Sequence, residues 1–265
     1  MEWSTDLSTY PTYWHSRLKR GFGLGTGSNY RPWLRVRDVP SDGSSGNPKG
    51  ITTGRTYHLL SKLERIYFHY LDRQPDVVDI REQFPILALS ETQSLCAELG
   101  VKHPAAGRYP EPFTFDFLVT RQKEGRLVYQ ARSIKTPGDA ADEKTRAKLN
   151  VEYQWSERNA LDWKLVDVSG FSDDLQSTLV FMRGWFSHRY SADERIANDF
   201  SQMFLKLYEP NVPLKELIQA CASRMKRGYS LAQNDFRYCA WAGLIPVKLN
   251  SKLTMHLPVT LDGKR

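Results

Sequence analysis

Residues 113–135, with the sequence FTFDFLVTRQKEGRLVYQARSIK, decide the fold of this chain. Phenylalanines at 113, 115 and 117 alternate with other residues at 114, 116 and 118, which is the period of a β-strand. A second extended run follows the turn at Glu124-Gly125. If these two residues form the whole loop, they fix the register of a hairpin, and residues whose numbers sum to 249 face each other. The segment therefore predicts two antiparallel strands.

This register gathers polar side chains on one face of the hairpin. Asp116 would lie opposite Ser133, and Lys135 opposite Thr114. Because strand side chains alternate between faces, Asp116, Ser133 and Lys135 would point the same way. Aspartate is disfavoured in the middle of a strand, so Asp116 is a candidate site residue. The alternative is a solvent-facing residue on a half-exposed sheet, and a one-residue slip in register would separate the three side chains.

Two glutamates on predicted helices are further candidates. Helical spacing of apolar residues extends over 57–74, and Glu64 lies within the apolar face of that helix. A carboxylate there is costly unless it is compensated, which favours a site residue, although Ser61 and Glu64 also fit a capping box. Glu152 lies on a charged predicted helix over 139–161. It could join the site or pair with Lys148, one turn away.

Together these residues suit metal-dependent cleavage of a phosphodiester. Carboxylate oxygens bind divalent ions such as Mg²⁺, which activate a water and neutralise charge on the leaving oxygen. A neighbouring lysine orients the water and stabilises the charged phosphorus centre. The restriction-endonuclease-like nucleases have these residues in the same order: a glutamate on a helix, then an aspartate on a strand, then a lysine on the next strand. Taken alone this pattern is weak evidence, because an aspartate and a lysine at such a distance are common.

The rest of the chain divides into three predicted parts. Residues 1–55 contain GFGLGTGSNY and SDGSSGNPKG and predict a basic flexible arm, without the register of a nucleotide-binding glycine loop. Residues 56–170 predict an α/β nuclease domain with a mixed sheet. Residues 171–265 predict an all-helical, winged-helix-like domain. Its expected helices are 173–186, 191–208, 212–226 and 230–242, followed by a hairpin around Asn250-Ser251.

The charge of the chain favours a polyanionic partner. The 265 residues contain 37 Lys and Arg against 30 Asp and Glu, a net charge of +7. Residues 1–55 carry eight basic and four acidic residues, 56–171 carry sixteen and seventeen, and 172–265 carry thirteen and nine. The excess therefore lies in the two flanks, where it could hold a phosphate backbone. The candidate DNA-binding residues are Arg224, Lys226, Arg227 and Arg237.

Several other classes of protein are disfavoured. No apolar run approaches the ~20 residues of a membrane span, and the N-terminus lacks the pattern of a secretory signal. The three cysteines are odd in number and widely spaced, which disfavours a disulfide framework and a zinc site. We therefore expect a cytoplasmic protein with no membrane partner.

Several segments together resemble the TnsA-type transposon-end endonucleases of multi-protein cut-and-paste transposition systems. The resemblance covers most of residues 17–168, and its motifs follow in the order and spacing of the family. The similar segments are GTGSNYRPWLRVRDVPS, HLLSKLERIYFHYL, VVDIREQFPIL, GVKHP, FTFDFLV and ARSIK. The set is specific because no single segment carries the resemblance.

The resemblance implies roles for particular residues. Glu64, Asp116 and Lys135 correspond to catalytic residues of the family. Glu64 and Asp116 would be ligands of Mg²⁺, in a site of one or two ions. Mn²⁺ would be able to replace Mg²⁺. Ser133 occupies a position where some members have glutamine and related nucleases have an acid, so it would be at most a weak ligand. Glu152 aligns with a helix glutamate near the active site and is a tentative ligand.

The resemblance also implies a function and partners. The protein would cut the 5′ ends of a transposon in a bacterial cell, while a DDE-type transposase cuts and joins the 3′ ends and an AAA+ ATPase regulates the complex. An alternative is a catalytically weak or inactive DNA-binding subunit of the same assembly, which Ser133 favours. A restriction or repair nuclease shares the chemistry, but the segment DIREQFP argues against it.

Overall fold

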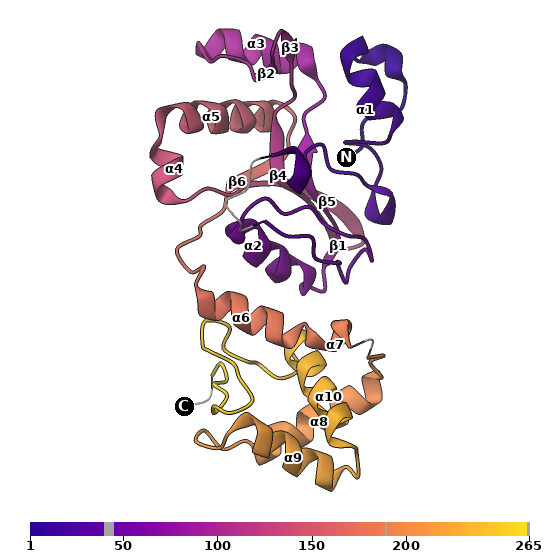
Figure 1. The fold of residues 1–265 in the computed structure, drawn as a ribbon, viewed down its shortest axis with the longest axis vertical. Helices are drawn as coiled ribbons and strands as arrows, with labels where there is room; N and C mark the ends of the chain where they lie inside the picture. The colour runs from indigo at the N-terminus through magenta and orange to yellow at the C-terminus, as the bar shows by residue number, and fades with distance from the viewer. Residues whose placement is uncertain (40–44, 189, 264–265) are drawn as a thin grey trace. The chain divides into compact units, whose positions relative to one another are not determined.

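The computed structural model describes residues 1–39, 45–188 and 190–263, which form two compact units (Figure 1). The first unit comprises Met1–Asp72 and Asp76–Val168, and the second comprises Arg73–Pro75 and Ser169–Arg265. Among the described residues, none of the helices combines the length and the apolar character needed to cross a membrane.

The first unit is built on a four-stranded mixed sheet. Its strands are β1 (Val77–Pro85), β4 (Thr114–Lys123), β5 (Arg126–Ser133) and β6 (Asp162–Leu165), in the order β1-β4-β5-β6. The first two pairings are antiparallel, and β5 pairs with β6 in parallel. The short strands β2 (Ala105–Ala106) and β3 (Tyr109–Pro110) form a separate pair. The prediction of an α/β domain with a mixed sheet, as a nuclease domain would have, is thereby confirmed.

The predicted hairpin has the expected register. Phe117 pairs with Arg132, and every recorded pair down to Lys123 and Arg126 follows the same rule. The loop residues Glu124 and Gly125 have φ angles of 47° and 77°. Positive φ at both loop positions is the requirement of the tight turn whose twist matches a hairpin, and glycine meets it without a steric cost.

Two helices cover opposite faces of the sheet (Figure 1). From α2, Phe68 packs in one buried cluster with Phe117 of β4. From α5, Trp155 packs in another with Leu118, the next residue of the same strand. The α-helices of this unit are α1 (His15–Lys19), α2 (Lys62–Asp72), α3 (Leu89–Leu99), α4 (Pro137–Ala141) and α5 (Glu143–Arg158). Short 3₁₀ turns occupy Leu7–Thr9, Thr12–Trp14, Gly27–Asn29 and Val36–Asp38.

Two predicted helices of the region 56–170 need correction, and one helix there was not predicted. The helix expected over 57–74 begins only at Lys62, because Leu59 pairs in an isolated β-bridge with Gly46. The helix expected over 139–161 is divided at Asp142, whose carboxylate accepts a hydrogen bond from the Thr145 amide and so begins α5. Helix α3 has no counterpart among the predicted helices.

The N-terminal segment is packed, so the expectation of a flexible arm is wrong for its described residues. Trp14 and Trp33 are buried in one cluster with Leu87, which follows β1. The glycine-rich stretch makes this contact possible, since a Cβ on Gly23 would lie 2.5 Å from the Pro85 side chain. Residues 40–44 of the expected arm lie outside the described residues.

The second unit is helical, as predicted. Its helices are α6 (Asp173–Met182), α7 (Gly184–Ser187), α8 (Glu194–Leu207), α9 (Leu214–Arg224) and α10 (Tyr229–Trp241). The expected hairpin around Asn250-Ser251 is not a regular strand pair in the described residues. An isolated bridge between Val247 and Leu261 takes its place, which pairs residues much farther apart than a tight turn would. The winged-helix assignment therefore stays a prediction.

Candidate active site

Asp116 is the third residue of β4 and is almost fully buried. Its Oδ2 accepts hydrogen bonds from the Ile134 amide at 2.6 Å and from the Lys135 Nζ at 2.9 Å. Among the described residues, its Oδ1 has only one long contact, 3.5 Å from the side-chain Nε2 of Gln83. One oxygen is thus fixed by the following strand, and the other keeps most of its capacity to accept.

Lys135 lies two residues beyond the end of β5 and forms an ion pair with Asp116, on the face of the hairpin that the predicted register gave to both. Its Nζ also donates to the Ile134 carbonyl at 2.8 Å, and a third of its side chain is exposed. Burial alone would lower the pKa of Lys135, but the Asp116 carboxylate outweighs it, so the pKa is raised. The group is therefore an ammonium ion with one side open to solvent.

Ser133 and Glu152 form a second buried pair beside the first. The Ser133 hydroxyl donates to the Glu152 Oε2 at 2.5 Å and accepts from the Trp163 indole at 3.2 Å. Burial raises the pKa of Glu152 to about 7, although the Ser133 hydrogen bond opposes the shift and the Asp116 charge adds to it. The alternative was an exposed ion pair with Lys148, but Glu152 is buried, and it accepts a hydrogen bond from Ser133.

Glu64 has both of the roles that the sequence left open. It stands in the first turn of α2, where its amide donates to the Ser61 hydroxyl at 3.1 Å and its Oε1 lies 3.2 Å from the same oxygen. Its Oε2 accepts from the Leu60 amide at 2.9 Å. Burial, followed by the Asp116 charge, raises the pKa of Glu64 to about 8. Glu64 therefore caps the helix and also interacts electrostatically with Asp116.

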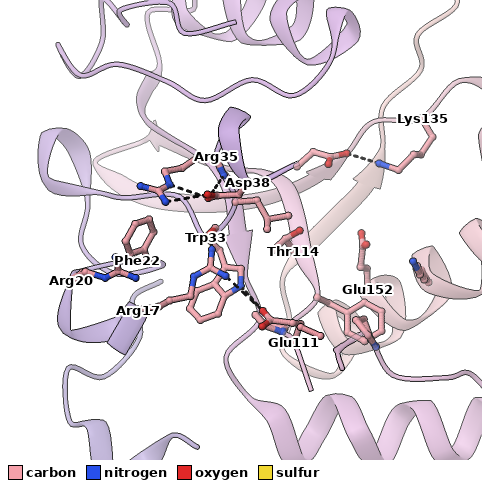
Figure 2. Close-up of a pocket in the computed structure, with 17 residues that line it drawn as sticks. Arg17, Arg20, Phe22, Trp33, Arg35, Asp38, Glu111, Thr114, Lys135 and Glu152 are labelled. Atoms are coloured by element: carbon pink, nitrogen blue, oxygen red, sulfur yellow. Dashed lines mark hydrogen bonds and ion pairs between the residues drawn. The ribbon is translucent and has the colours of Figure 1, made fainter. Parts of the chain in front are cut away.

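The sequence predicted that these residues meet, and they do form one electrostatic cluster. Asp116, Lys135 and Glu152 line a cleft of about 780 Å³ in the first unit (Figure 2). Both glutamates interact with the Asp116 charge although they come from different helices. Burial is the main cause of both raised pKa values, and the Asp116 charge adds to each, so the carboxylate forms of the two glutamates are disfavoured in the absence of a further positive charge. A divalent cation would supply that charge.

The donor set suits Mg²⁺ in chemistry, though it does not form a closed cage. Carboxylate oxygens are the ligands that this ion prefers, and it usually keeps several waters and needs few protein ligands. Among the described residues, no three acidic, histidine or cysteine side chains are gathered as a ready metal site. Asp116 through Oδ1, with Glu64 and Glu152 at its sides, is the set that could hold the ion.

Comparison with known proteins supports the resemblance seen in the sequence. The family model described as "TnsA-like endonuclease N terminal" matches residues 74–167. We call the residues that this model matches, 74–167, the TnsA-like domain. The chain is also 39% identical over 147 residues to the Transposon Tn7 transposition protein TnsA of Escherichia coli, covering 56% of this chain and 53% of that protein. The chain thus spans about half the length of this curated relative.

The TnsA-like domain contains three of the four clustered charged residues. Asp116, Lys135 and Glu152 lie within the matched region, whereas Glu64 precedes it on α2. The prediction that the chain resembles a TnsA-type endonuclease is confirmed. The roles of the individual residues stay predictions, because a family match assigns no role to a side chain.

Sequence reasoning missed Gln83, which links the packed N-terminal segment of the chain to Asp116. It lies on β1 directly across from Asp116, is buried, and has an unusual φ of 47°. Its side chain contacts Asp116 and Thr114, and its carbonyl accepts from the Trp33 amide at 3.2 Å. Non-glycine residues with positive φ often mark functional sites. Only the position of Gln83 within DIREQFP could have pointed to it.

The predicted DNA-binding residues of the second unit differ in their surroundings. Arg227 forms an ion pair with the buried Asp235, and Arg237 donates to Asn234 at 3.2 Å. These two guanidinium groups have structural partners. Arg224 and Lys226 at the end of α9 are exposed and can reach an external partner.

Proposed function

We propose that this protein is a Mg²⁺-dependent endodeoxyribonuclease that cleaves the 5′ ends of a transposon during cut-and-paste transposition. The observation that carries the proposal is the ion pair of Asp116 and Lys135 at 2.9 Å, inside a TnsA-like domain and in one cleft with Glu152. An acidic metal-binding group next to a solvent-accessible ammonium ion suits hydrolysis of a phosphodiester.

The residues of the chain have distinct parts in this chemistry. Asp116, with Glu64 and Glu152, would hold the cation, which supplies charge neutralisation and a more acidic water when bound. Lys135 would place its ammonium group against the attacking water or a phosphate oxygen, since its exposed side faces the cleft. The buried glutamates would give up their protons when the cation enters, because a nearby positive charge favours the carboxylate.

The partners follow from the same proposal. A separate DDE-type transposase would cut and join the 3′ ends, and an AAA+ ATPase would regulate the complex in the bacterial cytoplasm. The second unit would contact DNA or these proteins as a winged-helix-like domain. The exposed Arg224 and Lys226 are the residues best placed for such contacts.

A plasmid-nicking assay tests the proposed activity. A plasmid that carries a transposon end is incubated with the protein, the transposase and the regulator, and the 5′ cuts are mapped. We expect cuts with Mg²⁺ or Mn²⁺ and none after chelation with EDTA. Cuts of equal yield in EDTA would exclude the metal-dependent mechanism.

An inactive assembly subunit is the second candidate, and Ser133 favours it. The Ser133 hydroxyl is committed to Glu152 and Trp163, so the position that holds an acid in related nucleases supplies no free ligand here. The assay separates the two candidates, because the inactive subunit would support complex assembly without any 5′ cut at the transposon end.

Replacing Ser133 by alanine should change cleavage only modestly. The variant loses two hydrogen bonds, each of which contributes about 1 kcal/mol net, so we expect a loss of the rate between about fivefold and about thirtyfold in the nicking assay. Ser156→Ala is the matched control, since it is another buried serine of the same unit and its hydroxyl has no partner among the described residues. Complete loss of cleavage in Ser133→Ala alone would instead make Ser133 essential to the metal site.

A further inference from the structure

The active-site cleft has a second wall that the proposed chemistry does not use. Three guanidinium groups surround the ring of Phe22 in this wall (Figure 2). They belong to Arg17, Arg20 and Arg35, whose central carbons lie 5.6, 5.2 and 4.6 Å from the ring centroid. We call these three residues the arginine wall.

The arginine wall is held in place by the packed N-terminal segment. Arg17 stacks on Trp33 at 4.4 Å and donates to the Trp33 carbonyl. Arg35 donates twice to the Asp38 carboxylate, at 2.9 and 3.1 Å. Because aromatic stacking and these bonds fix the guanidinium groups, little conformational entropy is lost when they bind a ligand.

The positive charge of the wall exceeds its neutralisation. In the described part of the chain, the three arginines have two acidic neighbours. Asp38 pairs with Arg35 at 2.9 Å, and Glu111 makes a longer contact of 3.9 Å with Arg17. Arg20 is exposed, and its Nε donates to the Ser16 carbonyl at 3.1 Å rather than to a carboxylate. Like charges gathered around one ring repel each other, and an anion between them relieves the repulsion.

The neighbouring surface indicates an anion with a repeating charge. A second hollow of about 400 Å³ shares Phe22 and Arg35 with the cleft and adds the exposed Arg31 to its lining. Arg55 also lines it, but its charge is paired with the buried Glu82. Basic positions thus continue from the Asp116–Lys135 pair across the wall to the next hollow. A nucleic acid backbone presents phosphates at regular intervals, and arginine binds phosphate oxygens with its planar fork.

We propose that Arg17, Arg20 and Arg35 bind the phosphate backbone of DNA beside the position that is cut. That DNA is cut beside the arginine wall rests on the proposed nuclease function, whereas binding of DNA by the arginine wall does not. The packed N-terminal segment would then be one side of the substrate channel. Contacts of this kind carry no sequence information, so the wall would hold DNA of any sequence.

The test compares two adjacent charges on α1 in the full-length protein. Arg20→Gln removes a charge from the wall, and Lys19→Gln removes an exposed charge that does not line the cleft. Binding of a short fluorescent duplex is measured by anisotropy in EDTA, over a series of salt concentrations. We expect Arg20→Gln to weaken binding about three- to tenfold and to reduce the salt slope by about 0.9, as for the loss of one phosphate contact.

The possible results separate this proposal from the nuclease proposal. Equal binding by the two variants, or no binding of DNA by the unmodified protein at low salt, would overturn the arginine wall. Competition by polyglutamate as effective as by DNA would assign the wall to an acidic protein and also overturn it. If the protein never cuts in the nicking assay but Arg20→Gln alone weakens binding, the wall stands and the nuclease proposal falls.

Discussion

Asp116→Ala is expected to abolish 5′-end cleavage while the protein still assembles with the transposase and the regulator. Within the part of the chain that the structure describes, Asp116 is the one carboxylate that interacts with both Glu64 and Glu152 and also pairs with Lys135. A metal ion supplies several kcal/mol of transition-state stabilisation, and a loss of about 4 kcal/mol slows a reaction about a thousandfold. The nicking assay measures the cuts, and gel filtration of the complex measures assembly.

Two further variants make this result specific. Asp116→Asn keeps the shape of the side chain and an oxygen that can accept from the Ile134 amide, so its loss of activity would reflect charge rather than misfolding. Asp162→Ala is the control, because Asp162 is an aspartate of the same sheet whose partner is Arg132 and which does not line the cleft. Undiminished 5′ cuts by the Asp116 variants would reject the site.

The sequence predicted the site where its geometry depends on local rules. The two-residue turn fixed the register of the hairpin, and the register alone placed Lys135 on the side of Asp116. The apolar spacing around Glu64 also indicated a buried carboxylate correctly. These inferences succeed because strand alternation and helical periodicity are set by neighbouring residues.

The features that the sequence did not predict depend on contacts between distant segments. Trp14 and Trp33 lie among glycines and polar residues, which are typical of a loop, and only their burial against residues near β1 makes the segment rigid. Gln83 gave no signal beyond its position in DIREQFP, because its contact with Asp116 depends on a left-handed backbone on the neighbouring strand. The position of an N-terminal segment on a sheet edge is a tertiary property that local patterns do not contain.

The second large expected effect is on stability, and it concerns the ion pair that joins Arg55 to Glu82 of β1. Glu82 is fully buried on β1 and accepts from two nitrogens of Arg55 and, at 2.9 Å, from the His58 amide. Arg55 is itself buried and stacks on Tyr57 at 3.7 Å. Glu82→Ala would leave the guanidinium charge buried without its partner. Breaking a buried ion pair in this way costs about 3–5 kcal/mol.

Glu82→Ala should therefore lower the melting temperature of the protein by about 10 °C, as measured by circular dichroism. Asp76→Ala is the control, because Asp76 pairs with Arg121 at a partly exposed position where an ion pair contributes at most about 1 kcal/mol. The double variant Arg55→Met/Glu82→Leu replaces both charges with apolar groups and should recover most of the loss, since no charge stays buried alone. Equal effects of Glu82→Ala and Asp76→Ala would contradict the burial of this pair and, with it, the packing of the N-terminal segment that carries the arginine wall.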